Sequence, residues 1–222
     1  MTPRILGIAL AAAAAAPALA GEVKGTIHFK GALPALAPLV VGKDPARCGE
    51  TVPNQSVEVS DGHLRNVVVT VDARRRARPV PRTLAVDQLG CRYVPRVQVA
   101  PVGSTLQFRN GDPVLHNVRG RLGGATVFNV AMPLQGMQVP RALSKEGVVQ
   151  LACDVHPFME GWVVVTDQPA AVSGKDGTFV VGEVPPGTWA VTAWHERYGK
   201  QTRKVSVPAT GAAKVDFVFA GP

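Results

Sequence analysis

Short apolar runs separated by turn-forming residues make up most of this chain. Val, Thr, Phe and Trp recur in the runs, clusters of Gly, Pro, Asn and Asp stand between them, and helix periodicity is almost absent. That pattern is typical of an all-β protein. We expect strands over residues 22–29, 56–59, 64–71, 96–100, 105–110, 117–119, 126–130, 147–153, 161–166, 178–181, 188–194, 203–207 and 214–219.

A change in composition near Asp167 indicates two domains. Residues 21–166 are predicted to form a first β domain with an N-terminal β extension, and residues 167–222 a second, smaller β segment. About 55 residues are few for an independent sandwich. We therefore expect the second segment to pack against the first domain or to borrow a strand from it. Residues 22–29, whose faces alternate, are the candidate strand.

The first twenty residues have the pattern of a secretory signal peptide. Arg4 supplies a positive charge, residues 5–16 are apolar, and Ala18-Leu19-Ala20 is a small-x-small cleavage site. The predicted mature protein begins at Gly21 and is periplasmic. No later segment approaches the ~20 apolar residues of a membrane helix, so we expect no transmembrane segment in the mature form.

The chain is basic, which bears on its partners. Its formal net charge is +8, and +7 without Arg4. A basic surface favours acidic partners. The densest charge, residues 74–78, lies between two apolar runs and is predicted to be a solvated hairpin tip. We expect no nucleic acid partner, because the chain is predicted to be exported and lacks basic residues interleaved with aromatics.

The three cysteines are Cys48, Cys91 and Cys153, an odd number for an oxidising compartment. Cys48 and Cys91 lie in the N-terminal part, and our hypothesis is that they form a disulfide. Cys153 is then left as an unpaired thiol, and ligation to a metal would protect it.

The segment around Cys153 carries the strongest chemical signal. Cys153-x-x-His156-x-x-Met159 places a thiolate, an imidazole and a thioether in one loop between two apolar runs. A second imidazole, His116, stands in a similar strand-turn-strand setting 37 residues earlier. Two imidazoles, one thiolate and a weak axial thioether are the ligands of blue copper electron-transfer sites. The sequence therefore predicts one copper ion bound by these four residues.

Residues 94–166 resemble the cupredoxins, the family of type 1 blue copper proteins. CDVHPFMEGWVVV is similar to the amicyanin-type ligand loop, and GSTLQFRNGDPVLHNV to the strand before the first histidine ligand. The resemblance implies a Greek-key β-sandwich that carries single electrons between redox proteins. It implies that His116, Cys153 and His156 are equatorial ligands and that Met159 is the axial one.

The same resemblance assigns roles to neighbouring residues. Asn117 matches an asparagine whose backbone N–H and side chain brace the cysteine sulfur and the ligand loop. The ring edge of His156 is expected to reach the surface, where Pro157 and Phe158 would join an apolar docking patch.

Past the copper motif the chain departs from small cupredoxins, and residues 174–196 resemble the carboxypeptidase regulatory-like β-sandwich family. The shared features are turn motifs such as Val184-Pro185-Pro186-Gly187. Turn motifs specify β geometry, so we assign this segment no activity. The whole chain resembles plastocyanin-like bacterial proteins, a resemblance that names no electron donor, acceptor or oligomeric state.

Other classes of function fit the sequence less well than an electron carrier. A copper delivery or storage protein tends to carry Met/His clusters or CxxC pairs, whereas this chain has four Met and no CxxC. An enzyme is not predicted: His-x-His pairs of multicopper oxidases are absent, and the ligand loop holds one cysteine, not the two of a binuclear copper site. A surface- or carbohydrate-binding β module with incidental copper stays open because of Trp189 and Trp194.

Overall fold

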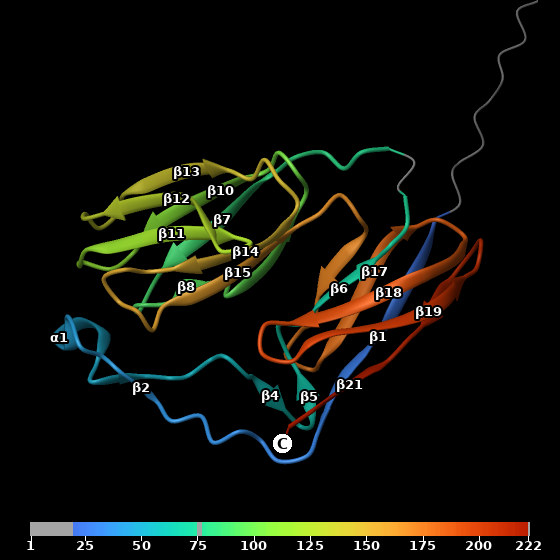
Figure 1. The fold of residues 1–222 in the computed structure, drawn as a ribbon, viewed down its shortest axis with the longest axis horizontal. Helices are drawn as coiled ribbons and strands as arrows, with labels where there is room; N and C mark the ends of the chain where they lie inside the picture. Colours follow the sequence, from blue (N-terminus) through green and yellow to red (C-terminus); the bar gives the residue numbers. More distant parts are fainter. Residues whose placement is uncertain (1–19, 75–76, 222) are drawn as a thin grey trace, which may run out of the picture.

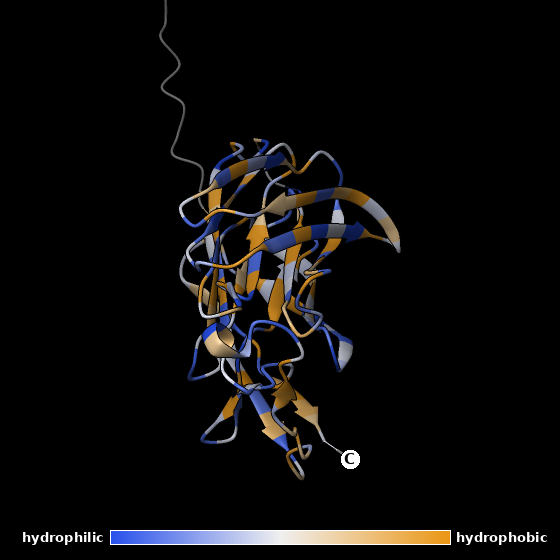
Figure 2. Ribbon diagram, turned by 90° about the vertical axis from the view of Figure 1, so that its left-hand side faces the viewer, coloured by the Kyte–Doolittle hydropathy of each residue, from blue (hydrophilic) through white to orange (hydrophobic). Residues whose placement is uncertain are grey.

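The computed structural model describes residues 20–74 and 77–221, whose regular secondary structure is almost entirely β-strand, as expected. The predicted signal peptide falls almost wholly on residues outside the described part. Two β-sandwiches lie side by side (Figure 1). Hydrophobic and hydrophilic residues alternate along many of their strands, because successive side chains of a strand face opposite sides of the sheet (Figure 2).

The first sandwich packs two sheets, with strand orders β13-β10-β7-β8 and β12-β11-β14-β15-β9, around one buried cluster. Its parallel pairs are β7 with β10 and β9 with β15, and the other pairs are antiparallel. The strands are β7 (Thr83–Gln88), β8 (Tyr93–Val94), β9 (Val97–Ala100), β10 (Thr105–Asn110), β11 (His116–Leu122), β12 (Ala125–Met132), β13 (Gln138–Ala142), β14 (Gly147–Ala152) and β15 (Glu160–Val165).

The second sandwich has its own buried cluster, to which strands from both ends of the chain contribute. β1 pairs with β17 antiparallel and with β20 and β21 parallel, so the first strand completes the C-terminal sheet as expected. β6 pairs with β16 and β18. The strands are β1 (Gly21–Lys30), β4 (Val59–Ser60), β5 (His63–Leu64), β6 (Val68–Val71), β16 (Ala170–Val172), β17 (Thr178–Val184), β18 (Gly187–His195), β19 (Gly199–Val207), β20 (Ala212–Lys214) and β21 (Phe217–Ala220).

A third, smaller cluster joins the two sandwiches. Val68 from the second packs with Val97 and Val164 from the first. Trp162 on β15 and Trp194 on β18 add an edge-to-face pair with ring centroids 5.7 Å apart. This apolar contact is reinforced by an ion pair between Arg96 and Glu196.

Residues 31–58, which we call the strap, leave β1, run beneath the first sandwich to its far end, and return to β4 (Figure 1). The strap contains β2 (Leu39–Val40), α1 (Pro45–Cys48) and β3 (Thr51–Val52), and β2 pairs with β3. The predicted disulfide between Cys48 and Cys91 is confirmed, with its Cα atoms 5.5 Å apart. It fastens the strap to the turn between β7 and β8.

Two features differ from the sequence-based expectation. The basic segment at residues 74–78 does not lie in a hairpin, because β6 and β7 belong to different sandwiches and the segment connects them. β13 was not expected as a strand, since Pro140 interrupts its pattern; it is an edge strand, where proline is tolerated. In the described part of the chain, no helix has the length and apolarity needed to span a membrane.

Candidate metal centre

Strand pairing brings the predicted ligands to one end of the first sandwich. His116 is the first residue of β11, Cys153 directly follows β14, and Met159 directly precedes β15. β14 lies between β11 and β15 in the sheet. Residues that are 37 positions apart therefore meet where three neighbouring strands begin or end.

The ligand loop is closed by a turn. The backbone N–H of Met159 donates to the carbonyl of His156 at 2.9 Å. Pro157 takes the second position of this turn, where the fixed φ of proline is favourable. The turn reverses the chain between β14 and β15 and leaves the side chains of Cys153, His156 and Met159 buried.

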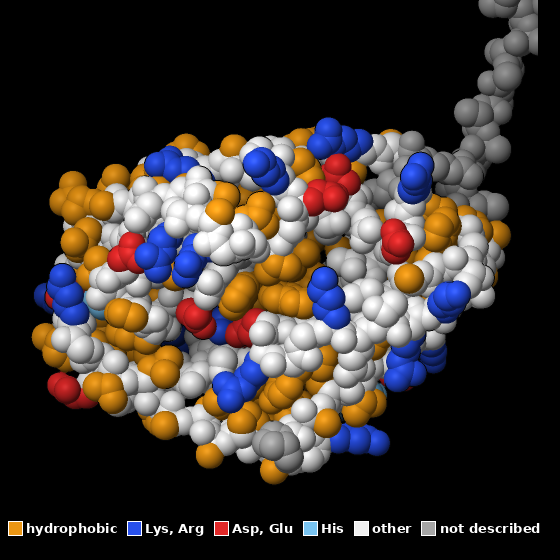
Figure 3. Space-filling view, in the orientation of Figure 1, with side chains coloured by type: hydrophobic (Ala, Val, Ile, Leu, Met, Phe, Trp, Pro, Cys, Tyr) orange, Lys and Arg blue, Asp and Glu red, His pale blue; other side chains and the backbone are white. Residues whose placement is uncertain are grey.

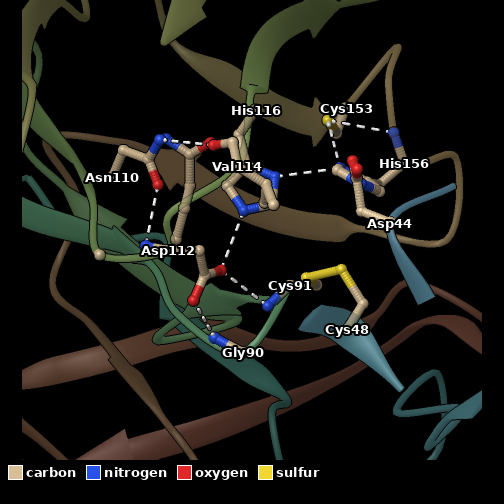
Figure 4. A network of polar contacts seen from close by, with 12 residues as sticks. Asp44, Cys48, Gly90, Cys91, Asn110, Asp112, Val114, His116, Cys153 and His156 are labelled. Atoms are coloured by element: carbon tan, nitrogen blue, oxygen red, sulfur yellow. Dashed lines mark hydrogen bonds and ion pairs between the residues drawn. A yellow bond between two sulfur atoms is a disulfide. The ribbon is translucent and has the colours of Figure 1, made fainter. Parts of the chain in front are cut away.

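Three donor atoms converge in this buried space (Figure 4). Nδ1 of His116 lies 3.0 Å from Nδ1 of His156, and Sγ of Cys153 lies 4.0 Å from the latter. All three ligand atoms lie within 4.8 Å of one another. Both imidazoles are 0 % exposed and Cys153, which carries a free thiol, is 2 % exposed.

Each imidazole also has a carboxylate at its outer nitrogen. Nε2 of His116 lies 2.9 Å from Oδ2 of Asp112, and Nε2 of His156 lies 3.1 Å from Oδ2 of Asp44. An ionised carboxylate only accepts hydrogen bonds, so each Nε2 carries the proton. A neutral imidazole protonated at Nε2 has a bare lone pair at Nδ1.

The two Nδ1 atoms face one another at 3.0 Å, and in two neutral imidazoles of this tautomer both would carry lone pairs. Lone pairs at this distance repel unless a cation or a proton lies between them. Burial lowers the pKa of His156 from its usual 6.5, and the neighbouring His116 lowers it further, while Asp44 opposes the shift. The neutral form of His156 is thus favoured, and the pair is arranged to receive a metal ion, with the outer carboxylates fixing both ring orientations.

The cysteine sulfur is held by backbone donors. The N–H groups of Asn117 and His156 both point at Sγ of Cys153, each at 3.4 Å. The side chain of Asn117 accepts from the N–H of Asp154 at 2.7 Å and donates to Asn129. The bracing role that the sequence implied for Asn117 is present, and two N–H donors stabilise a thiolate at this position.

Tyr93 is a further part of this network that sequence reasoning missed. Its hydroxyl donates to the backbone carbonyl of Asn117 at 2.7 Å. Burial raises the pKa of Tyr93 well above 10.0, and the nearby Cys153 raises it further. The phenol therefore stays protonated and keeps Asn117 in place.

Asp112 connects the site to the disulfide. Its carboxylate accepts from the N–H of Gly90 at 2.8 Å and of Cys91 at 2.9 Å, besides contacting His116. Its own N–H donates to the side chain of Asn110 at 3.0 Å. Cys91 also lies close enough to Asp112 and His116 to form a ligand group, but its sulfur is bonded to Cys48.

The side chain of Met159 lies in the same buried region as the other predicted ligands. The hydrogen bond between this residue and His156 comes from its backbone N–H. Met159 is 1 % exposed and belongs to the same buried cluster as Cys153. A cavity of about 30 Å³, roughly the liquid volume of one water molecule, separates part of the strap from the loop and is lined by Phe158, Met159 and Glu160 among others.

The structure corrects one expectation at this site. The ring edge of His156 does not reach the surface, because Asp44 of the strap lies on its outer nitrogen. Phe158 faces the cavity under the strap and packs near His156, with ring centroids 5.6 Å apart. Asp112 lies four residues before His116, so a local signal for it exists, whereas nothing in the local sequence marks Asp44.

The solved structures that are similar to this protein match less than half of the chain. No family model and no curated protein matches. Among solved structures, a purple cupredoxin from Nitrosopumilus maritimus is 28 % identical, over 38 % of this chain and 98 % of that one, with a TM-score of 0.33. A reduced mutant of amicyanin is 25 % identical, over 44 % of this chain and 97 % of that one, with a TM-score of 0.34.

A longer protein is also similar. The copper-containing nitrite reductase from Thermus scotoductus is 24 % identical over 40 % of this chain, with a TM-score of 0.33, and the chain spans 23 % of its length.

Proposed function

We propose that this protein is a periplasmic type 1 copper protein that carries single electrons between redox partners. The observation that carries the proposal is the pair of buried imidazoles whose Nδ1 atoms face each other at 3.0 Å, beside the thiol of Cys153. Two imidazoles and one thiolate suit copper, and Met159 supplies a soft fourth donor. When bound, copper would supply a one-electron couple between Cu(I) and Cu(II).

Hydrogen bonds around the site hold the donor atoms in fixed positions, which supports such a couple. Asp44 and Asp112 fix the imidazoles, and Asn117 fixes the sulfur. A rigid donor set needs little rearrangement when the charge of the ion changes. Four donors leave no open position for a substrate, which favours a carrier over an enzyme. Burial of the donors and the covering strap argue against rapid metal exchange, the property that delivery would require.

The disulfide is consistent with the periplasmic part of the proposal. Disulfides form and persist in oxidising compartments. Cys48 and Cys91 are bonded while Cys153 is kept apart as a thiol.

The test is the visible and EPR spectrum of the purified protein loaded with Cu(II). We expect an intense thiolate-to-copper band in the visible region and a type 1 EPR signal. Cys153→Ser should lose nearly all of the band while its far-UV circular dichroism is unchanged. His63→Asn, which removes a histidine from the second sandwich, is the matched control and should keep the band. An intense band retained in Cys153→Ser would refute the proposal.

A further inference from the structure

The strap covers the ligand through which electrons would otherwise leave most directly. His156 is 0 % exposed, and Asp44 of the strap lies on its outer nitrogen at 3.1 Å. A partner approaching this end of the sandwich therefore meets the strap before it meets the imidazole.

The strap is anchored at several points, so it is a built part of this surface. Cys48 is bonded to Cys91, and the carbonyl of Gln55 accepts from Nε of Arg96 at 3.0 Å. Within the strap, Val41 donates its N–H to the carbonyl of Glu50 at 3.0 Å. Val41 and Val52 are each 5 % exposed, so the inner side of the strap is apolar and packed.

Asp44 is directed at His156 by its own backbone. It has φ 57 and ψ 39, in the left-handed region that aspartate tolerates better than most residues. It also precedes α1, yet its side chain makes no capping hydrogen bond with that helix. The carboxylate is therefore left to contact His156, and it joins the strap's outer surface to the metal centre.

Two cations and one further carboxylate, that of Glu50, occupy exposed positions in this part of the strap. Lys43 and Arg47 stand on either side of Asp44, and both are exposed. Neither forms an ion pair with another described residue. Val40, 77 % exposed, supplies an apolar side chain on the same segment.

We propose that this part of the strap, with the exposed residues Val40, Lys43 and Arg47, is the docking surface for an acidic one-electron redox protein. The proposal rests on the electron-carrier function above. One electron passes between the reduced protein and its oxidised partner by way of the contact between Asp44 and His156. No covalent bond forms or breaks and no proton moves. The two free cations pair with carboxylates of the partner, while the ring of His156 stays covered.

The surface can be mapped without bound copper, by NMR of the apoprotein with hexacyanochromate(III). This paramagnetic anion is not reduced under these conditions and broadens the amide signals nearest to where it binds. We expect selective broadening over residues 42–47 in the wild type and its loss in the double variant Lys43→Glu, Arg47→Glu. The matched control Lys204→Glu, Lys214→Glu changes the net charge equally on exposed residues of the second sandwich and should leave the broadening in place.

This control is needed because basic side chains are spread over both halves of the molecule (Figure 3). Stopped-flow oxidation of the reduced copper protein by hexacyanoferrate(III) gives the second readout. At low ionic strength the strap variant should react about tenfold more slowly than wild type, and high salt should remove the difference. The second-sandwich variant should change the rate much less.

The outcomes separate this proposal from the electron-carrier proposal. A type 1 spectrum with equal effects of the two double variants would overturn the strap surface and leave the electron carrier intact. Broadening confined to the strap in a protein without a type 1 spectrum would overturn the electron carrier. Anion binding away from the strap, or a strap that binds anionic lipid vesicles and no anionic redox agent, would also overturn the docking proposal.

Discussion

Oδ2 of Asp44 lies 3.1 Å from Nε2 of His156, although 112 positions separate the two residues along the chain. The other imidazole has a local partner, since Asp112 lies four positions before His116. Both outer nitrogens thus meet a carboxylate, one from a turn beside its histidine and one from a distant strap. This symmetry turns both inner nitrogens toward a common point.

The partner of His116 can be removed by Asp112→Ala. The change leaves His116 without its outer acceptor and the N–H groups of Gly90 and Cys91 without theirs. We expect copper affinity to fall by about 10–100-fold and the free energy of unfolding of the apoprotein to fall by about 2 kcal/mol. Competition with a copper chelator and urea unfolding measure the two effects.

Asp87→Ala is the control for that variant. Asp87 lies in the same sandwich, and its 3.8 Å ion pair with Arg109 is partly exposed. Its removal should leave copper affinity unchanged. Equal affinities of Asp112→Ala and wild type would show that Asp112 does not position His116.

The proposed axial role of Met159 predicts an effect on the reduction potential. Met159→Leu should retain copper and raise the potential, because losing the weak thioether favours Cu(I). A Met-to-Leu exchange in a core costs less than about 1.5 kcal/mol, so the fold should survive. Voltammetry measures the change. Met137→Leu, a half-buried methionine packed against the same core, is the control; a potential unchanged in Met159→Leu would place its sulfur outside the coordination sphere.

Removing the disulfide should destabilise the protein through its unfolded state. Cys48 and Cys91 are 43 positions apart, and closing a loop of that size is worth about 4 kcal/mol. The double variant Cys48→Ser, Cys91→Ser should lose about that much free energy of unfolding in urea. Titration of the denatured, unreduced wild type should find one thiol per chain, and three would contradict the assignment.

Buried His195 predicts a dependence of stability on pH. Burial, together with the charges of Arg96 and Arg197, lowers its pKa from 6.5 to about 4. The contribution of His195 to the free energy of unfolding is therefore complete above pH 6.5. It is lost as the pH falls toward 4, because in that range only the unfolded chain takes up the proton. Between about pH 7.5 and pH 5 this amounts to about 2 kcal/mol.

The neighbouring Glu196 changes stability with pH in the opposite direction. The measurement must therefore compare wild type with a variant that lacks only His195. Burial raises the pKa of Glu196 to about 7, against the opposing charge of Arg96. Its contribution is complete below about pH 4.5 and is lost as the pH rises through 7. Urea unfolding should therefore compare wild type with His195→Phe, which keeps Glu196 and packs with Tyr198 and Phe219 as His195 does.

The difference in free energy of unfolding between wild type and His195→Phe should shrink by about 2 kcal/mol from pH 7.5 to pH 5. His28→Asn, which alters a half-buried histidine on β1, should show no such trend against wild type. A difference independent of pH would mean that His195 keeps an ordinary pKa in the folded protein.

Much of the local structure could be predicted from the sequence. The alternation in residues 22–29 and the apolar runs at 147–153 and 161–166 predicted strands that form as β1, β14 and β15. β7 was missed, because its Thr83–Gln88 segment combines exposed, half-buried and buried positions without a strong apolar signal.

The sequence by itself determined that Cys153, His156 and Met159 share one loop, because they are so close in the chain that one turn brings them together. It also indicated the pairing of Cys48 with Cys91 through the odd number of cysteines. Only the tertiary structure decided that Asp44 covers His156 and that Tyr93 holds Asn117. Those contacts depend on where the strap and β8 pack, and packing between distant segments leaves no periodicity or spacing in the chain.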